Sequence, residues 1–314
     1  MKAAVVTAWG DTPRYEDYPE PASERGAVVE VLAAALHPRV RSQAAGSHYS
    51  STDELPMVPG IDGVGRMPNG ELAYFLLGDA ALGSMATRTL VDPRRAVTLP
   101  PDADPVAIAA AMNPAMSSWV ALRRRIALAP GAAVMVLGAT GNAGGLAIRV
   151  ARLLGAGSVV AVGRGSDDRL AALGADAFVS LDGDPAAYEQ ALGAAGARVD
   201  VVLDYLWGQV TADALAAIVP RRADASQELT WIQIGSMAGL EAPVPSAALR
   251  AARLSIVGSG QGSVPTRDIA AEIGELAGAI MRGELTVETT VAPLANVEQW
   301  WAPREGSARV VFVP

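Results

Sequence analysis

The chain has 314 residues, of which 51% are hydrophobic and 18% charged, and this composition is typical of a globular protein with two domains. The formal net charge of -8 at pH 7 offers no basic surface for a phosphate backbone, so we expect no nucleic acid partner. The chain contains no cysteine, which excludes disulfides and every thiolate-bound zinc site.

Residues 1–100 predict a β-rich first domain. Short strand-like runs are separated by Pro and Gly, as in small antiparallel domains, and they occupy residues 3–7, 27–33, 72–77 and 86–91. Residues 1–6 enter the first of these runs directly, without the apolar core and cleavage site of a signal peptide. No uninterrupted apolar run reaches the length of about 18 residues expected of a membrane span. We therefore expect a cytoplasmic protein without a membrane partner.

The second part of the chain predicts alternating helices and strands. A helical pattern over residues 105–128 ends at Pro130-Gly131. Predicted strands then cover residues 132–137, 158–162, 177–181, 199–203, 229–234 and 254–257, and predicted helices cover residues 144–154, 169–173, 186–194 and 211–219. The strands are rich in Val, Ile and Leu on both faces, which is typical of a parallel sheet covered by helices on both sides. The sequence therefore predicts an α/β fold with a doubly wound parallel sheet.

The C-terminal segment predicts one more helix and two strands. The helix covers residues 267–281 and ends at Gly283, and the strand-like runs follow at residues 286–291 and 309–313. Because these strands come after the doubly wound sheet, we expect them to pair with strands of the first domain.

A glycine-rich turn lies between the strand at 132–137 and the helix at 144–154. A dinucleotide pyrophosphate requires a tight strand-to-helix turn, a closely approaching backbone and a helix N-terminus with N–H groups, and Gly138, Gly141 and Gly144 can supply these conditions. The spacing G-x-x-G-x-x-G is a weak signal alone, and a turn without a ligand is the alternative. Its position between a strand and a helix favours dinucleotide binding.

The second strand of this half, residues 158–162, is followed by Gly163 and Arg164. NAD-binding proteins place an acidic residue here for the ribose hydroxyl, whereas an arginine is suited to the 2′-phosphate of NADPH. We find no carboxylate in position to repel that phosphate, so NADPH is favoured over NADH. The alternative is that Arg164 points into solvent, because Asp167 and Asp168 can compete for it.

Three segments resemble the zinc-independent medium-chain dehydrogenases/reductases, in particular the quinone oxidoreductases. These are Leu36-His37-Pro38 followed by Gly46, then residues 55–65 with Pro59-Gly60-Ile61-Asp62-Gly63-Val64-Gly65, and Ala172-Leu173-Gly174-Ala175-Asp176. The resemblance covers nearly the whole chain. It implies a GroES-like β-rich domain over residues 1–118, completed by residues 262–314, and a Rossmann NADPH-binding domain over residues 119–261.

The chain also departs from this family. Zinc alcohol dehydrogenases of the superfamily carry Gly-His-Glu and a catalytic cysteine, whereas this chain has Gly60-Ile61-Asp62 and no cysteine, so we expect no metal. His37 and Val40 stand where quinone oxidoreductases have Asn and Asp, which leaves the proton donor open.

Without zinc, the resemblance implies hydride transfer from NADPH to a quinone or to the β-carbon of an α,β-unsaturated carbonyl compound. Tyr49 is the first candidate for a hydrogen-bond donor to the substrate oxygen, and His48, His37 and Asn113 are further catalytic candidates. Each of the first three can instead be an ordinary loop or structural residue. Met116 and Trp119, near Asn113, are better explained by core packing.

The turn, the end of the second strand and the resemblance together predict the cofactor-binding residues. They are Gly138, Ala139, Thr140, Gly141, Asn142, Ala143 and Gly144 in the turn, Gly163 and Arg164 after the second strand, and Ser117, Tyr205, Gly235, Ser236 and Gly260 around the nicotinamide and ribose. Tyr205 and Trp207 can form an aromatic wall, or they can be buried by packing.

Residues 254–258 resemble the strand by which family members extend the sheet across a homodimer. Two other functions stay open: a metal-free carbonyl reductase or alcohol dehydrogenase, and a non-catalytic NADPH-binding sensor or structural protein.

Overall fold

The computed structural model describes residues 1–22, 26–48, 51–78, 80–165, 168–260, 262–303, 306 and 308–314, with backbone only at residues 168 and 169. The chain forms two compact units, Met1–Asn113 with Ala270–Pro314, and Pro114–Ile269. The boundaries fall inside the helices α2 (Pro105–Val120) and α8 (Thr266–Met281). The boundaries predicted from the sequence lie at residues 118/119 and 261/262 instead.

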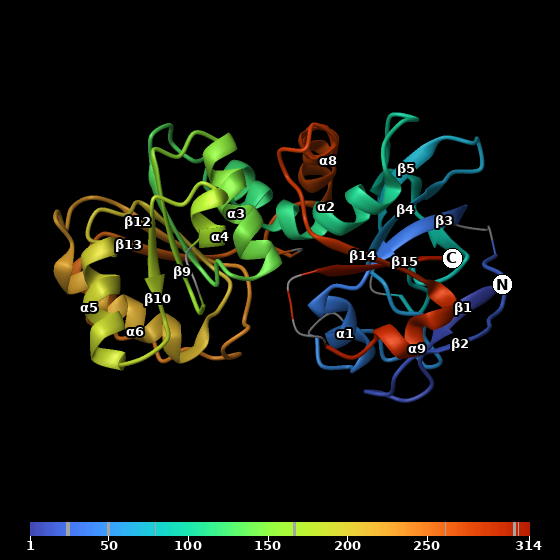
Figure 1. Cartoon of the computed structure of the whole chain (residues 1–314), viewed down its shortest axis with the longest axis horizontal. Coiled ribbons are helices and arrows are strands. Elements are labelled where there is room, and N and C mark those ends of the chain that lie inside the picture. The colour runs from blue at the N-terminus through green and yellow to red at the C-terminus, as the bar shows by residue number, and fades with distance from the viewer. Residues whose placement is uncertain are drawn as a thin grey trace. The chain divides into compact units, whose positions relative to one another are not determined.

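The first unit contains a seven-stranded sheet and a separate two-stranded sheet (Figure 1). The order in the larger sheet is β14-β15-β3-β4-β5-β7, with β6 also paired to β3. The elements are β1 (Lys2–Val5), β2 (Arg14–Asp17), β3 (Ala27–Ala35), α1 (Pro38–Ala44), β4 (Asp62–Arg66), β5 (Leu72–Leu76), β6 (Arg88–Val91), β7 (Ala96–Thr98), β14 (Thr289–Pro293), α9 (Val297–Trp300) and β15 (Arg309–Val313).

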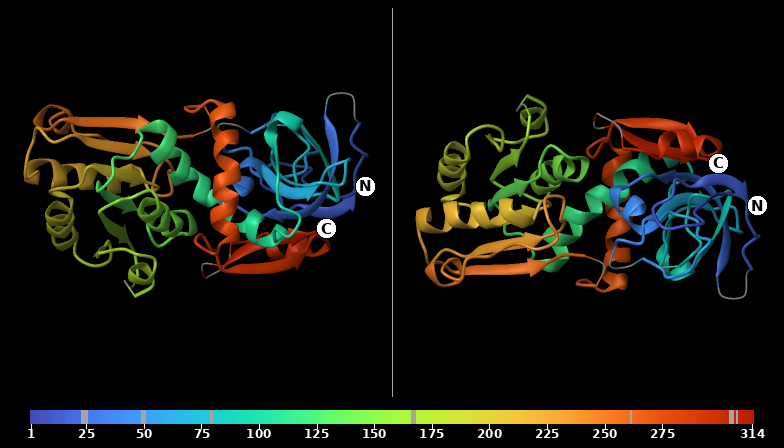
Figure 2. Two further views of the ribbon diagram at one scale, coloured as in Figure 1. Left: turned by 90° about the horizontal axis from the view of Figure 1, so that it is seen from above. Right: turned by 90° about the horizontal axis from the view of Figure 1, so that it is seen from below.

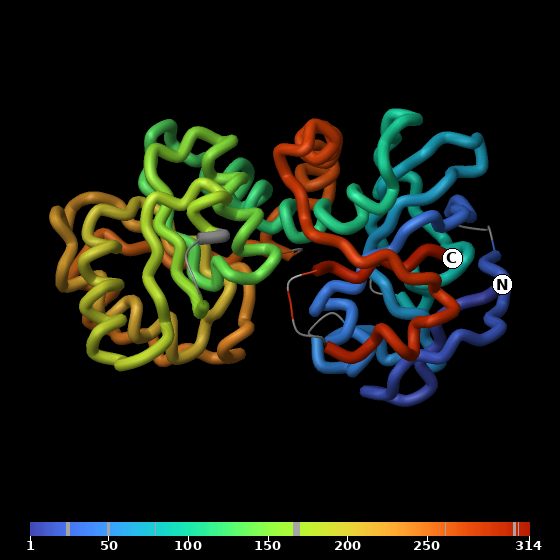
Figure 3. The backbone as a smooth tube through the Cα atoms, viewed as in Figure 1, coloured from blue at the N-terminus to red at the C-terminus, as the bar shows by residue number. Residues whose placement is uncertain are grey.

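The C-terminal strands return to the first unit, as predicted. β15 runs parallel to β14 and antiparallel to β3, with Val311 opposite Ala35 and Phe312 opposite Ala34. The tube in Figure 3 shows the red C-terminal segment beside the blue N-terminal strands of the same unit. Phe312 is fully buried in a core that also contains Phe75 and Met57. The first unit is therefore completed by residues from both ends of the chain.

Three strands of the first unit, β2, β4 and β7, are absent from the sequence prediction. β4 has the sequence Asp-Gly-Val-Gly-Arg, whose two glycines are unfavourable for a strand. It is a strand because β3 and β5 pair with it on both sides. A Cβ at Gly65 would lie 2.5 Å from the carbonyl oxygen of Glu30, so close packing requires this glycine.

The second unit is a six-stranded parallel sheet in the order β10-β9-β8-β11-β12-β13. This is the 3-2-1-4-5-6 order of a doubly wound fold. The strands are β8 (Ala133–Leu137), β9 (Ser158–Gly163), β10 (Ala177–Ser180), β11 (Val201–Asp204), β12 (Leu229–Gln233) and β13 (Leu254–Gly258). The helices are α3 (Asn142–Leu153), α4 (Asp168–Ala172), α5 (Pro185–Gly196), α6 (Gly208–Ile218) and α7 (Ala248–Ala251).

Helices cover both faces of the parallel sheet. α3 and α4 lie on one side and α5 and α6 on the other, which Figures 1 and 2 show from three directions. The largest buried side chain of the core on one face is Trp231, which packs with Met135 and Leu215. The observed strands and helices follow the predicted ones closely, because most of the strands are rich in Val, Ile and Leu.

One stretch, Pro105–Arg125, is long and apolar enough to cross a membrane by length and composition alone. It consists of α2 and a π-helical turn over Ala121–Arg125, so the helix ends earlier than the predicted residue 128. Within its apolar window, 72% is buried inside the protein. Core helices pass the same test, and packing accounts for this composition.

Candidate functional site

The turn after β8 lies at the centre of the parallel sheet, between β9 and β11. Gly138 has a φ of 88°, which favours glycine, and its N–H donates to the Val162 carbonyl at 2.9 Å. The N–H of Ala139 donates to the same carbonyl at 2.9 Å, and Ala139 is fully buried. These two residues therefore hold the turn against β9, and their own N–H groups are engaged within the domain.

The helix α3 begins directly after this turn, with Gly141 as its N-cap. Gly141 has no side chain to cap the first-turn N–H groups, and no acidic residue stands in the first turn. Gly141 is exposed, and Thr140, Asn142 and Ala143 are half-buried, so this end of the helix opens to the surface of the unit. Such an end provides N–H donors and a positive partial charge for an anion.

Gly144 permits the tight approach of helix and turn. A Cβ at this position would overlap the carbonyl oxygen of Gly138 and lie 2.7 Å from its carbonyl carbon. Gly163, at the end of β9, is similarly confined, because a Cβ there would lie 2.9 Å from Cγ2 of Thr140. The backbone of the turn thus reaches the geometry that a pyrophosphate requires, and the residues fit NADPH.

Arg164, after β9, is 81% exposed, and its Nε lies 4.0 Å from Oδ1 of Asp182. The expectation that no carboxylate is positioned near a 2′-phosphate is therefore wrong. Asp182 is 18 positions further along the chain, and it lies here because β10 pairs in parallel with β9. Asp167, one of the predicted competitors, is outside the described residues, as is the side chain of Asp168.

The ends of β11 and β12 come close to the same turn. A Cβ at Gly138 would lie 3.2 Å from Cβ of Tyr205, and a Cβ at Gly235 would lie 2.8 Å from the Tyr205 carbonyl oxygen. The structure therefore brings together Gly138, Tyr205 and Gly235. Ser236 is exposed beside Gly235, and Gly260 is exposed in a loop where its N–H donates to Ser263 Oγ at 2.7 Å.

The Tyr205 side chain is buried rather than open to solvent. Its hydroxyl and Ser117 Oγ form a hydrogen bond of 2.9 Å, and Ser117 also donates to the Pro114 carbonyl at 2.7 Å. Burial raises the pKa of Tyr205 to about 12, against the smaller opposing effect of its serine partners. Tyr205 is therefore a neutral phenol at physiological pH. Trp119 and Met116 are buried, so the prediction of core packing is confirmed for both.

Asp204, the last residue of β11, organises the loop that contains Tyr205, a role that the sequence analysis missed. Its Oδ1 accepts from the N–H groups of Leu206 and Trp207, each at 2.9 Å. Its Oδ2 accepts from Thr211 Oγ1 at 2.5 Å and from Trp231 Nε1 at 2.8 Å. Asp204 is fully buried, and Trp207 has a φ of 55°, which is rare for a bulky residue. The four hydrogen bonds hold this conformation.

In the first unit, His37 belongs to a buried polar cluster. Its Nε2 lies 3.3 Å from Asp62 Oδ1 without the orientation of a hydrogen bond, and Tyr74 donates to Asp62 Oδ2 at 2.7 Å. Burial lowers the pKa of His37 more than the attraction of Asp62 raises it. Arg309 of β15 donates to the Leu36 carbonyl at 2.9 Å, and burial lowers its pKa to about 10. His37 is thus a buried, neutral imidazole.

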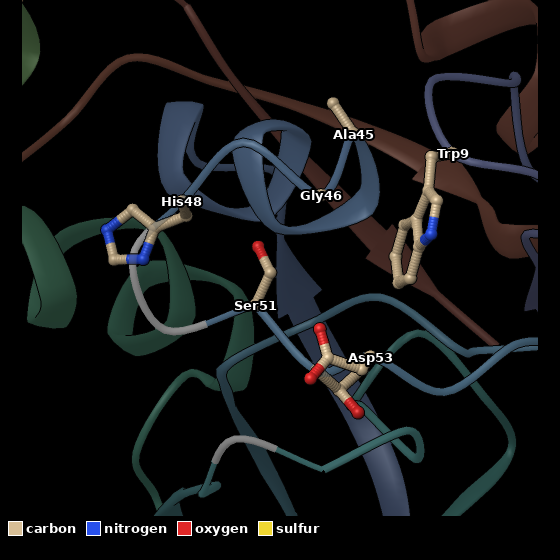
Figure 4. A pocket seen from close by; sticks show the side chains of 7 residues that line it. Trp9, Ala45, Gly46, His48, Ser51 and Asp53 are labelled. Atoms are coloured by element: carbon tan, nitrogen blue, oxygen red, sulfur yellow. The ribbon is translucent and has the colours of Figure 1, made fainter.

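His48 lies at the wall of a cavity of about 330 Å³ in the first unit. Figure 4 shows His48, Ser51 and Asp53 around it, with the Trp9 indole on the opposite side. The lining residues are Trp9, Ala45, Gly46, His48, Ser51, Thr52 and Asp53. Tyr49 is outside the described residues. Asn113 is half-buried in α2, at the end of the first unit's N-terminal segment.

No family model matches the sequence. A probable NADPH-dependent quinone reductase of Emericella nidulans, tdiC, is 30% identical over 365 aligned positions that cover all of both chains. The chain belongs to the NADPH-dependent quinone reductases. The quinone oxidoreductase of Thermus thermophilus, solved alone and with NADPH, is similar with a TM-score of 0.80 and 25% identity over all of both chains. A mycobacterial quinone oxidoreductase has the same fold, with a TM-score of 0.81 and 21% identity over all of both chains.

The predicted family and the predicted fold class, a GroES-like β-rich domain plus a Rossmann domain, are confirmed by these comparisons. The individual site residues stay predictions.

Proposed function

We propose that this quinone reductase family member uses NADPH to reduce a quinone or the β-carbon of an α,β-unsaturated carbonyl compound, without zinc. The observation that carries this proposal is the N-terminus of α3, which has no side-chain cap. It packs tightly against the turn that begins at Gly138, at the centre of a parallel sheet. Ligands bind at this edge of doubly wound sheets, where the strand order reverses.

The chain's own residues divide the binding of NADPH between them. Thr140, Gly141, Asn142 and Ala143 face the pyrophosphate at the start of α3, and Arg164 pairs with the 2′-phosphate. Tyr205 and Gly235 border the nicotinamide ribose, with Ser117 fixing the Tyr205 hydroxyl. When bound, NADPH supplies a hydride, and the protein orients the acceptor and excludes water.

On the acceptor side, Tyr49 and His48 are the proposed donors to the substrate oxygen. His48 lines the cavity of the first unit and is half-buried. His37 is less suited to donate a proton directly, because it is buried and its lowered pKa leaves it neutral. We assign His37 a positioning role beside Asp62. We propose that Asn113 contacts the nicotinamide.

The proposal that zinc is not required rests on the metal-ligating side chains that the chain contains. The sequence has no cysteine and only two histidines. Over the described part of the chain, no three His, Asp or Glu side chains converge on a point that could hold a metal ion. The cysteine-containing zinc sites of the superfamily's alcohol dehydrogenases cannot form here.

The first test measures NADPH oxidation by the protein after metal ions have been removed with a chelator. The acceptors are a quinone, an enone and the saturated ketone that corresponds to that enone. We expect chelator-resistant turnover with quinone or enone. Arg164→Asp should lower kcat/KM for NADPH by about tenfold or more, because a charge-assisted contact becomes a repulsion. The change for NADH should be much smaller.

The control is Arg253→Asp, which reverses another exposed charge, beside the amino end of β13. Preference for the saturated ketone would indicate a carbonyl reductase or alcohol dehydrogenase. Tight NADPH binding without turnover of any acceptor would indicate a sensor or structural protein and contradict the proposed activity.

We also propose that the protein is cytoplasmic and has no nucleic acid or membrane partner.

We further propose a homodimer formed through β13. β13 is the last strand in the sheet order, and the loop before it exposes Met237 and Leu240, with Leu249 exposed on α7. Light scattering should give twice the chain mass of 32.2 kDa. Leu240→Glu should shift the protein toward monomer, while Leu153→Glu on α3 should not. A monomer at all concentrations would contradict the dimer.

A further inference from the structure

The turn after β9 is closed by a carboxylate from the neighbouring strand. Asp182 Oδ2 accepts from the N–H of Gly165 at 2.8 Å, and Oδ1 lies 4.0 Å from Arg164 Nε. The N–H of Asp182 donates to Ser180 Oγ at 3.2 Å. Gly165 has a φ of 92°, a conformation that favours glycine. The Gly165 N–H therefore holds the carboxylate of Asp182, and Ser180 Oγ holds its backbone N–H.

Arg164 is held much less firmly than the acid. Its side chain is 81% exposed, and that of Asp182 is 54% exposed. An exposed ion pair such as Arg164 and Asp182, with 4.0 Å between Nε and Oδ1, contributes little to stability. The guanidinium can therefore turn toward a more strongly charged anion. Asp182 is tethered more firmly, because its carboxylate accepts from Gly165 and its backbone N–H donates to Ser180. A phosphate bound to Arg164 would then lie close to a fixed negative charge.

We propose that Asp182 is a specificity-determining residue that limits the preference for a 2′-phosphate over a 2′-hydroxyl, and that the site therefore accepts both NADPH and NADH. This inference rests on the proposed function. Arg164 attracts the 2′-phosphate, and Asp182 repels it. A ribose hydroxyl is neutral and can donate a hydrogen bond to the same carboxylate, which is the role of the acidic residue in NAD-binding proteins.

The test is titration calorimetry of the full chain with adenosine 2′,5′-bisphosphate and adenosine 5′-monophosphate, which needs no turnover. Asp182→Asn removes the charge, while the amide oxygen can still accept from Gly165. We expect the dissociation constant of the bisphosphate to fall by about three- to tenfold, because one unit of repulsion is lost. That of the monophosphate should change little.

Salt separates a charge effect from a geometric one. The Debye length falls from about 10 Å at 0.1 M to about 3 Å at 1 M ionic strength, so the gain in Asp182→Asn should largely vanish at high salt. The control is Glu228→Gln, which removes an exposed charge from the residue before β12, in the other half of the sheet. It should leave both affinities unchanged.

Two failures can be told apart. If the wild type binds neither nucleotide, the proposed cofactor site itself is wrong. If it binds them and Asp182→Asn leaves the bisphosphate affinity unchanged or weakens it, Asp182 does not limit the preference and the inference is overturned. Thermal unfolding checks that the variant is folded, and Asp182→Ser, which also removes the charge, must change the bisphosphate affinity in the same direction.

Discussion

Replacing Gly144 with alanine is expected to weaken NADPH binding by about a hundredfold, an effect typical of small displacements in a preorganised site. The added Cβ would overlap the Gly138 carbonyl oxygen and lie 2.8 Å from Cα of Ala139. Both neighbours are backbone, so no side chain can turn away, and the turn itself must open. Opening it moves the N–H groups of α3 away from the pyrophosphate. Titration of the variant with NADPH measures the loss.

The same substitution should lower the free energy of unfolding by about 1–3 kcal/mol, as overpacking does elsewhere. Gly274→Ala is the matched control, because it makes the same change in helix α8, where a Cβ meets no atom within 4 Å. This control should bind NADPH normally and unfold at the same or a slightly higher urea concentration. Unchanged NADPH affinity in Gly144→Ala would contradict a pyrophosphate site at this turn.

Replacing Asp204 with asparagine is expected to lower the free energy of unfolding by about 3 kcal/mol or more. The buried carboxylate accepts four hydrogen bonds with its two oxygens. An amide keeps one oxygen and places an NH₂ group against donors, so at least one buried N–H loses its acceptor even if the Thr211 hydroxyl turns to accept. Urea unfolding, followed by tryptophan fluorescence, measures the change. We also expect weaker NADPH binding, because the loop that contains Tyr205 is released.

The control for this second prediction is Asp224→Asn. Asp224 is an exposed carboxylate that accepts from the N–H and the hydroxyl of Ser226 at 2.8 and 2.6 Å. Surface substitutions of this kind change stability by about 0.5 kcal/mol or less. Equal stability of the two variants would show that the Asp204 hydrogen bonds do not hold the loop.

The strands and helices of the second unit could be predicted from the sequence because their signals are local. β8 is an apolar run of Ala, Val, Met and Leu, and the glycines of the following turn lie within seven residues. The alternation of strands and helices predicts a doubly wound parallel sheet, whereas the strand order comes from the structure. In contrast, β4 contains two glycines and is a strand only through its pairing with β3 and β5.

The family, the doubly wound half and the glycine-rich turn after β8 could be predicted from the sequence, because short-range spacing encodes each of them. The groups that meet across longer separations are known only from the folded structure. Asp182 lies 17 positions from Gly165, and Asp204 lies 27 positions from Trp231. His37 appears in the sequence as a loop histidine, yet it is buried beside Asp62 and Tyr74. Strand pairing and packing bring such partners together, and neither periodicity nor residue spacing records them.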